Sequence, residues 1–162
     1  MTPSPPLFVP GPVNELLWHI AFNRAAEVNE RLVKGREDIF LGNEFAVAAA
    51  KRLPDEAVSY YIDILRSDEH ALRGSFGFYR ALDTTIAQNE QRKTRRLTLP
   101  VLAIGAEHST GEGPADTMKL AADDVQSLVI PGAGHWVAEE APEELLAALT
   151  AFLAPYRAGV PA

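Results

Sequence analysis

Hydrophobic residues recur every three or four positions over the first half of the chain, a spacing typical of helices with one buried face. The clearest case follows Pro54, where Val58, Tyr61 and Ile62 keep that spacing and Asp55 is suited to cap the helix. In chain order, the pattern predicts a helix capped by Asn14, then Val28–Val33, Arg36–Lys51, a helix from Asp55 onward, and Glu69 to about Gln88 with a bend or a close approach at its glycines.

The C-terminal part has a different pattern. Two short apolar runs, Leu99–Gly105 and Ser127–Ile130, have the composition of buried strands. Pro114–Ala122 between them predicts a helix, and a second helix from Glu143 to about Tyr156 follows a proline. Strand, helix, strand and helix in this order form a parallel crossover unit, so the predicted fold class is α/β.

Composition places the chain among globular proteins. Its 162 residues suit one domain, with 47% hydrophobic and 23% charged residues. The net charge of −7 argues against nucleic acid as a main partner. Without cysteine, neither a disulfide nor a cysteine zinc site can form. No apolar run suits a membrane span, and no basic start precedes an apolar core at the N-terminus, so we expect a cytoplasmic protein.

The same pattern divides the chain into four parts. Residues 1–12 are rich in proline and predict an extended arm. Residues 13–94 are predicted to be helical, 95–157 to form the strand and helix unit, and 158–162 to be a short tail. The basic run Arg92–Arg96 lies near the central boundary. Because the net charge is −7, we interpret this run as a solvated linker rather than as a phosphate site.

A glycine-rich turn follows the second predicted strand, with Pro-Gly-Ala-Gly-His-Trp at Pro131–Trp136. Its two glycines let the backbone turn sharply and leave His135 at the carboxyl edge of the sheet. In open α/β sheets this edge is where ligands bind. An isolated histidine in a loop is most often structural, but the strand, the turn and the proline-started helix around His135 favour a functional one.

This C-terminal arrangement resembles the end of an α/β-hydrolase. The predicted helical region contains stretches that look like the helical caps of the epoxide hydrolase branch, which also includes fluoroacetate dehalogenase. The resemblance covers roughly residues 12–156 and implies a cap at 13–94 followed by the last β-α-β-α part of the hydrolase core. The stretches that carry it are Leu17–Phe22, Leu32–Glu37, Leu53–Ala57 and Gly74–Ala81.

The resemblance implies roles for four residues. His135 matches the histidine of a nucleophile–histidine–acid triad, which activates water against an ester intermediate. Tyr79 matches a cap tyrosine whose hydroxyl donates to an epoxide oxygen or helps to hold a leaving halide. Trp18 and His19 match a pair that lines the cap side of the substrate pocket. Purely structural interpretations stay open for Tyr79, Trp18 and His19.

The chain also departs from the family pattern. The family nucleophile is an aspartate on a strand-to-helix elbow, and neither the elbow nor the oxyanion hole is found in this sequence. Ser109 stands where one arrangement of the family has the triad acid. Glu107 or Glu112 could substitute for it, and in the dehalogenase-like arrangement the acid would lie before residue 1.

No metal or cofactor is predicted. The four histidines are His19, His70, His108 and His135, and no pair of them has helical ligand spacing with a nearby carboxylate. His70 and His108 are expected to be surface residues.

The expected function is therefore that of an incomplete hydrolase. It would hydrolyse small epoxides or halo-acids only if an N-terminal half supplied the nucleophile. The strand edge beside Val101–Ile104 would otherwise be open, so we expect a homo-oligomer or binding of that half. The expected ligand is small and apolar. The alternative is a non-catalytic module, derived from this fold, that binds a small ligand or another protein.

Overall fold

The structure is a computed structural model that describes residues 12–92 and 94–157. The predicted tail at 158–162, and all of the predicted arm except Pro12, lie outside these residues. Pro12 itself begins the first helix. We call residues 12–92 the helical part and residues 94–157 the sheet part.

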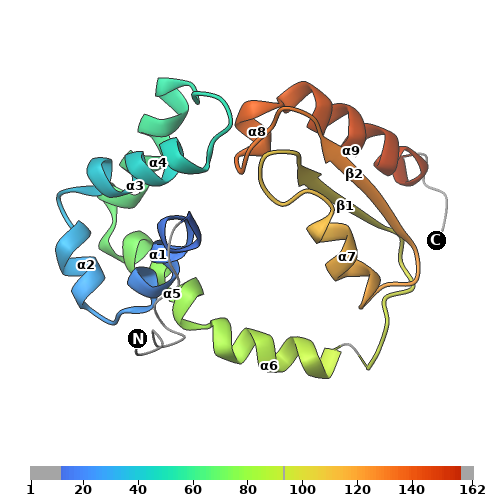
Figure 1. Cartoon of the computed structure of the whole chain (residues 1–162), viewed down its shortest axis with the longest axis horizontal. Coiled ribbons are helices and arrows are strands. Elements are labelled where there is room, and N and C mark those ends of the chain that lie inside the picture. The colour runs from blue at the N-terminus through green and yellow to red at the C-terminus, as the bar shows by residue number, and fades with distance from the viewer. Residues whose placement is uncertain (1–11, 93, 158–162) are drawn as a thin grey trace, which may run out of the picture.

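Helices fill the helical part, as the hydrophobic spacing predicts. The helix Val28–Val33 has its predicted bounds, whereas the break within Glu69–Gln88 falls at Ala81 and not at the glycines. Asp55 is the first residue of its helix, and Pro54 occupies the N-cap position. The elements are α1 (Pro12–Arg24), α2 (Val28–Val33), α3 (Glu37–Ala48), α4 (Asp55–Ser67), α5 (Glu69–Arg80) and α6 (Leu82–Arg92), seen in Figure 1.

A first hydrophobic cluster holds four of these helices together. It contains Val33, Leu72 and Phe76, with Phe22 and Phe40 packed against it. Phe76 is only 2% exposed, and its ring centre lies 5.9 Å from that of Phe40. Because its members come from α1, α2, α3 and α5, this cluster fixes how these helices face one another.

A second cluster joins the helical part to the sheet part. Phe45, Leu53 and Ile62 are buried in it, and Trp136 packs against them. The ring centres of Phe45 and Trp136 are 4.7 Å apart. Trp136 belongs to the glycine-rich turn after the second strand, so burial of aromatic surface draws this turn onto α3 and α4.

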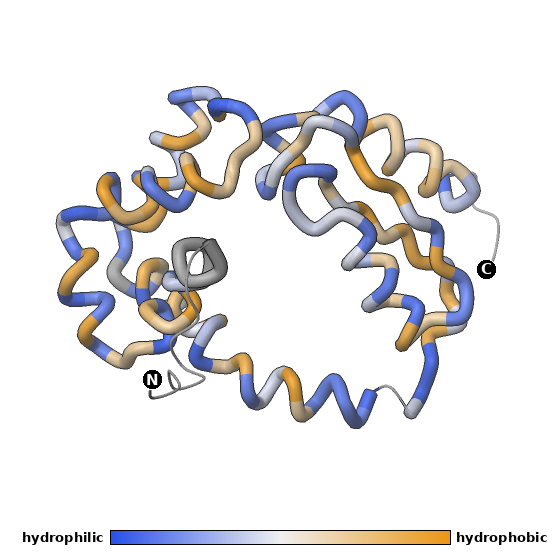
Figure 2. Tube along the Cα trace, in the orientation of Figure 1, coloured by the Kyte–Doolittle hydropathy of each residue, from blue (hydrophilic) through white to orange (hydrophobic). Residues whose placement is uncertain are grey.

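The sheet part has the predicted order of strand, helix, strand and helix. β1 (Val101–Ala106) and β2 (Val125–Ile130) pair in parallel along their whole length. α7 (Gly113–Lys119) connects them, and α8 (Val137–Glu140) and α9 (Pro142–Arg157) follow β2. Figure 1 shows α7 and α9 flanking the strand pair, and Figure 2 shows hydrophobic residues along the strands.

A third cluster lies where the strands meet the last two helices. Ala106, Ile130, Ala133 and Ala141 are buried in it, and Leu145 of α9 packs against them. Within the described residues, each strand is paired with only one other strand. Both strands therefore have an open edge in this part of the chain, including the edge that the sequence predicts.

Candidate functional site

One pocket, of about 360 Å³, is lined by residues of both parts of the molecule. α1, α3 and α5 contribute from the helical part, and the turn after β2 and the loop after β1 contribute from the sheet part. This volume lies at the lower end of the range for small-molecule sites. The titratable side chains in its lining are His19, Glu44, Tyr79, His108 and His135.

The turn that carries His135 is fixed by two glycines. Gly132 has a φ of 65°, in the left-handed region that favours glycine. At Gly134 a Cβ atom would lie 2.4 Å from the backbone nitrogen of Ala50, so only glycine permits this close approach. The backbone N–H of His135 then donates to the carbonyl of Ala48 at 2.9 Å. These contacts hold the histidine turn, residues 131–136, against the end of α3.

The same junction contains a buried carboxylate that sequence reasoning missed. Glu140 is 9% exposed, and its side-chain oxygens accept from the backbone N–H groups of Gly134, Trp136, Ala50 and Lys51 at 2.8–3.0 Å. Burial raises the pKa of Glu140, but the four N–H donors outweigh it and hold the pKa below its usual range. Glu140 thus joins the histidine turn to the α3–α4 loop.

On the helical side of the pocket, His19 and Tyr79 lie together. Their ring centres are 6.0 Å apart and their planes are nearly perpendicular, at 89°. Nδ1 of His19 is 3.9 Å from a carboxylate oxygen of Glu44. Trp18 does not line this pocket and packs instead beside Phe22, with ring centres 5.7 Å apart. The structure therefore brings His19, Tyr79 and His135 to one pocket and leaves Trp18 outside it.

His135 has no acid partner in the part of the chain that the structure describes. Its exposed ring lies 4.9 Å from the ring of Trp136, edge to face. Glu107 accepts from the backbone N–H of Gly132 at 2.7 Å, and Glu112 accepts from the hydroxyl of Ser127 at 2.5 Å. Neither candidate acid is engaged with His135.

The loop after β1 supplies the remaining polar lining. His108 and Ser109 line the pocket, and His108 is exposed, as expected from the sequence. The backbone N–H of His108 donates to the carbonyl of Ala133 at 2.9 Å, which brings this loop beside the histidine turn. Among the described residues, no group of three or more potential metal ligands is found.

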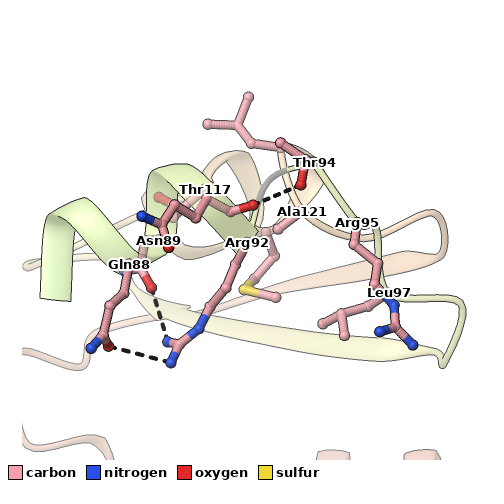
Figure 3. Close-up of a pocket in the computed structure, with 11 residues that line it drawn as sticks. Gln88, Asn89, Arg92, Thr94, Arg95, Leu97, Thr117 and Ala121 are labelled. Atoms are coloured by element: carbon pink, nitrogen blue, oxygen red, sulfur yellow. Dashed lines mark hydrogen bonds between the residues drawn. The ribbon is translucent and has the colours of Figure 1, made fainter.

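A second, larger pocket of about 730 Å³ lies between the end of α6 and α7 (Figure 3). Its lining includes Arg92 and Arg95, and no histidine or carboxylate is among its described lining residues. Arg92 donates to the side-chain oxygens of Gln88 and Asn89 at 3.4 and 3.3 Å. Among the described residues, this pocket therefore has amide, hydroxyl and guanidinium groups in its lining.

The basic run beside this pocket has a structural role. The Arg96 guanidinium binds Asp123 at 2.5 Å and donates to backbone carbonyls at the end of α7, including Leu120 at 3.2 Å. A cation in this place interacts favourably with a helix C-terminus. Lys93, in the middle of the run, lies outside the described residues.

Comparison with protein-family models and with curated proteins finds no match to this chain. Among solved structures, the chain is similar to Cfl2 from Burkholderia cenocepacia, with 28% identity, a TM-score of 0.78, and coverage of 92% of this chain and 52% of that one. The chain is also similar to the epoxide hydrolase CorEH, with 21% identity and a TM-score of 0.80. The match covers 92% of this chain and 54% of CorEH. A third similar structure is the Cif epoxide hydrolase from Acinetobacter nosocomialis, with 23% identity and a TM-score of 0.77. That match covers 84% of this chain and 44% of the other.

These similarities define the class of protein. The fold is that of a helical cap and part of an α/β-hydrolase core, which confirms the predicted fold class. The solved structures that match include epoxide hydrolases, so the predicted resemblance to the C-terminal half of that branch is also confirmed. The chain spans about half the length of the solved structures it matches.

Proposed function

We propose that this chain supplies the cap and the triad histidine of an epoxide hydrolase-like enzyme. Together with an N-terminal half that carries the nucleophile, it would hydrolyse small epoxides or halo-acids. The observation that carries the proposal is the single pocket of about 360 Å³ that His135 shares with the His19–Tyr79 pair. A base on one wall and a phenol on the other are the groups that hydrolysis through an ester requires of this half.

The proposed chemistry has two steps. A carboxylate nucleophile from the other half attacks an epoxide carbon, the carbon–oxygen bond breaks, and the hydroxyl of Tyr79 gives its proton to the departing oxygen. Tyr79 suits this step because a phenol is a neutral donor at pH 7. In the second step His135 takes a proton from water, and the resulting hydroxide attacks the ester and releases the diol. For a halo-acid, Tyr79 instead donates a hydrogen bond to the leaving halide.

A non-catalytic module is the second candidate. It is favoured by the His135 ring, for which no contact with a carboxylate is found in the described residues. Such a module would keep the pocket as a binding site for a small apolar ligand and would show no turnover.

The open strand edges support assembly with another polypeptide as part of the same proposal. Either a second copy of this chain or an N-terminal hydrolase half could cover them. In the described parts of the chain, no helix has the length and apolar character that a membrane span needs. A cytoplasmic location stays a prediction.

Complementation tests the proposal. The chain is mixed with an N-terminal half taken from a full-length relative, and hydrolysis of styrene oxide and chloroacetate is measured. We expect turnover only from the mixture. His135→Ala should lower it by about 10³–10⁴-fold and Tyr79→Phe by about 10²-fold.

Matched controls outside the pocket are His70→Ala and Tyr60→Phe, both at exposed positions, which should keep the activity of the mixture. Association of the halves with activity that survives His135→Ala would contradict the triad assignment. Halves that never associate would favour the non-catalytic module.

A further inference from the structure

Three residues that line the pocket each have a buried polar atom with no hydrogen-bond partner in the described part of the chain. These atoms are Asn23 Oδ1, Glu44 Oε1 and Trp136 Nε1, and all three residues line the pocket that contains His135. A buried polar group without a partner costs about 1–3 kcal/mol. Atoms of this kind, gathered around one cavity, indicate that a ligand with complementary polar groups completes them.

Two of the three atoms are acceptors on the helical wall. Asn23 lies four residues after His19, so both side chains leave the same face of α1. Asn23 is 5% exposed, and its backbone carbonyl is already occupied by the side-chain amide of Asn29 at 3.0 Å. The Oδ1 atom of Asn23 is a buried acceptor to which no described residue donates.

Glu44 provides the second acceptor from α3. One of its carboxylate oxygens lies 3.9 Å from Nδ1 of His19, and the other, Oε1, is the atom without a partner. Burial raises the pKa of Glu44, and the His19 imidazole and the Asn43 side chain lower it by less. The carboxyl group of Glu44 therefore already faces the His19 imidazole, which could otherwise attract an anionic substrate.

We propose that Asn23 and Glu44 form the polar end of the pocket and that each accepts a hydrogen bond from a different hydroxyl group of the substrate. This assignment rests on the proposed function and narrows it: the preferred substrates are neutral epoxides that carry hydroxyl groups, and halo-acids are disfavoured. A carboxylate has no proton to donate at neutral pH, so a halo-acid would leave both acceptors unfilled, and a hydroxy acid such as mandelate would leave one of them unfilled, beside a second acid. Because its acceptors would stay unpaired, a carboxylate substrate should bind more weakly than a neutral substrate with hydroxyl groups.

The test measures binding to the 162-residue chain itself by calorimetry. The two probes are 1-phenylethane-1,2-diol and mandelate, which differ only in a hydroxymethyl group that is replaced by a carboxylate. The wild type should bind the diol at least about tenfold more tightly than mandelate. Glu44→Gln replaces one carboxylate oxygen with an amide that can donate, so it should bring the two affinities to within about threefold.

Glu144→Gln makes the same chemical change at an exposed position of α9 and should keep the wild-type ratio. Thermal unfolding of each variant verifies that it is folded. Equal affinities in the wild type, an unchanged ratio in Glu44→Gln, or binding of neither probe would overturn the inference.

The complementation assay separates this inference from the proposed function. Turnover that depends on His135, combined with no Glu44-dependent preference for the diol, would retain the function and overturn the substrate assignment. A Glu44-dependent preference without turnover in any mixture would overturn the function, and the selectivity would then describe the binding module.

Discussion

The two walls of the pocket are held in place by different forces. On the sheet side, backbone hydrogen bonds fix the histidine turn: four N–H groups converge on Glu140, and the His135 N–H meets the carbonyl of Ala48. On the helical side, packing places His19 and Tyr79, because the cluster around Phe76 fixes α1 against α5. The sheet wall therefore depends on polar groups and close backbone approach, and the helical wall depends on buried apolar surface.

The largest expected effect tests the helical wall. Phe76→Ala should lower the free energy of unfolding by about 3–5 kcal/mol, since it empties the centre of a cluster that joins four helices. Phe78→Ala is the matched control, because Phe78 is 80% exposed, and it should change stability by less than about 0.5 kcal/mol. Urea unfolding followed by circular dichroism measures both. Similar losses for the two variants would contradict the packing described for α5.

The next effect tests the polar sheet wall. Glu140→Ala removes the acceptor of four backbone N–H groups and should cost about 3 kcal/mol or more in the same unfolding measurement. Glu139→Gln is the neighbouring control. Glu139 accepts from the hydroxyl of Tyr61, a bond between exposed side chains, so its loss of stability should stay below about 1 kcal/mol.

The lowered pKa of Glu140 adds a pH dependence to that comparison. A carboxyl group whose folded pKa is depressed stabilises the fold above the unfolded value of 4.5, and this contribution is lost as the pH falls through the folded pKa. The stability difference between the wild type and Glu140→Ala should therefore be largest near pH 7 and shrink below pH 4.5. A difference that does not change with pH would mean that Glu140 is not held as a carboxylate.

A smaller effect on stability is expected when alanine replaces Gly134 or Gly42, which have different surroundings. Gly134→Ala should destabilise by about 1–3 kcal/mol, because its Cβ would lie 2.4 Å from the backbone nitrogen of Ala50. Gly42→Ala, within α3, meets no atom within 4 Å and should stabilise by about 0.5–1 kcal/mol through helix propensity. The two substitutions should therefore change the free energy of unfolding in opposite directions. A change in the same direction would contradict the close approach inferred at Gly134.

The same contrast explains what the sequence can predict. The histidine turn follows from local signals, because an apolar strand, two glycines and a proline-started helix are contiguous in the chain. The role of Glu140 depends on Ala50 and Lys51, which lie about 90 residues away, so no local pattern could indicate it. Glu44 did leave a signal, since an acid stands among hydrophobic residues on the inner side of its helix.

Two details of the helical part could not be predicted from the sequence. Trp18 and His19 are adjacent on α1, and successive helix residues point about 100° apart, so they face different surroundings. A resemblance that pairs them cannot decide which one lines the pocket. The break between α5 and α6 falls at Ala81 although glycines precede it, because tertiary packing overrides a propensity difference of about 1 kcal/mol.

Histidine resonances offer the most direct test that the two walls form one ligand site. The chain has four histidines, of which His19, His108 and His135 line the pocket and His70 does not. Ring-carbon spectra are recorded during titration with 1-phenylethane-1,2-diol and assigned by single His→Gln substitutions. We predict that the signals of His19 and His135 shift along one saturation curve with a common dissociation constant, while His70 does not move. Movement of only one of the two, or two different constants, would contradict a shared pocket.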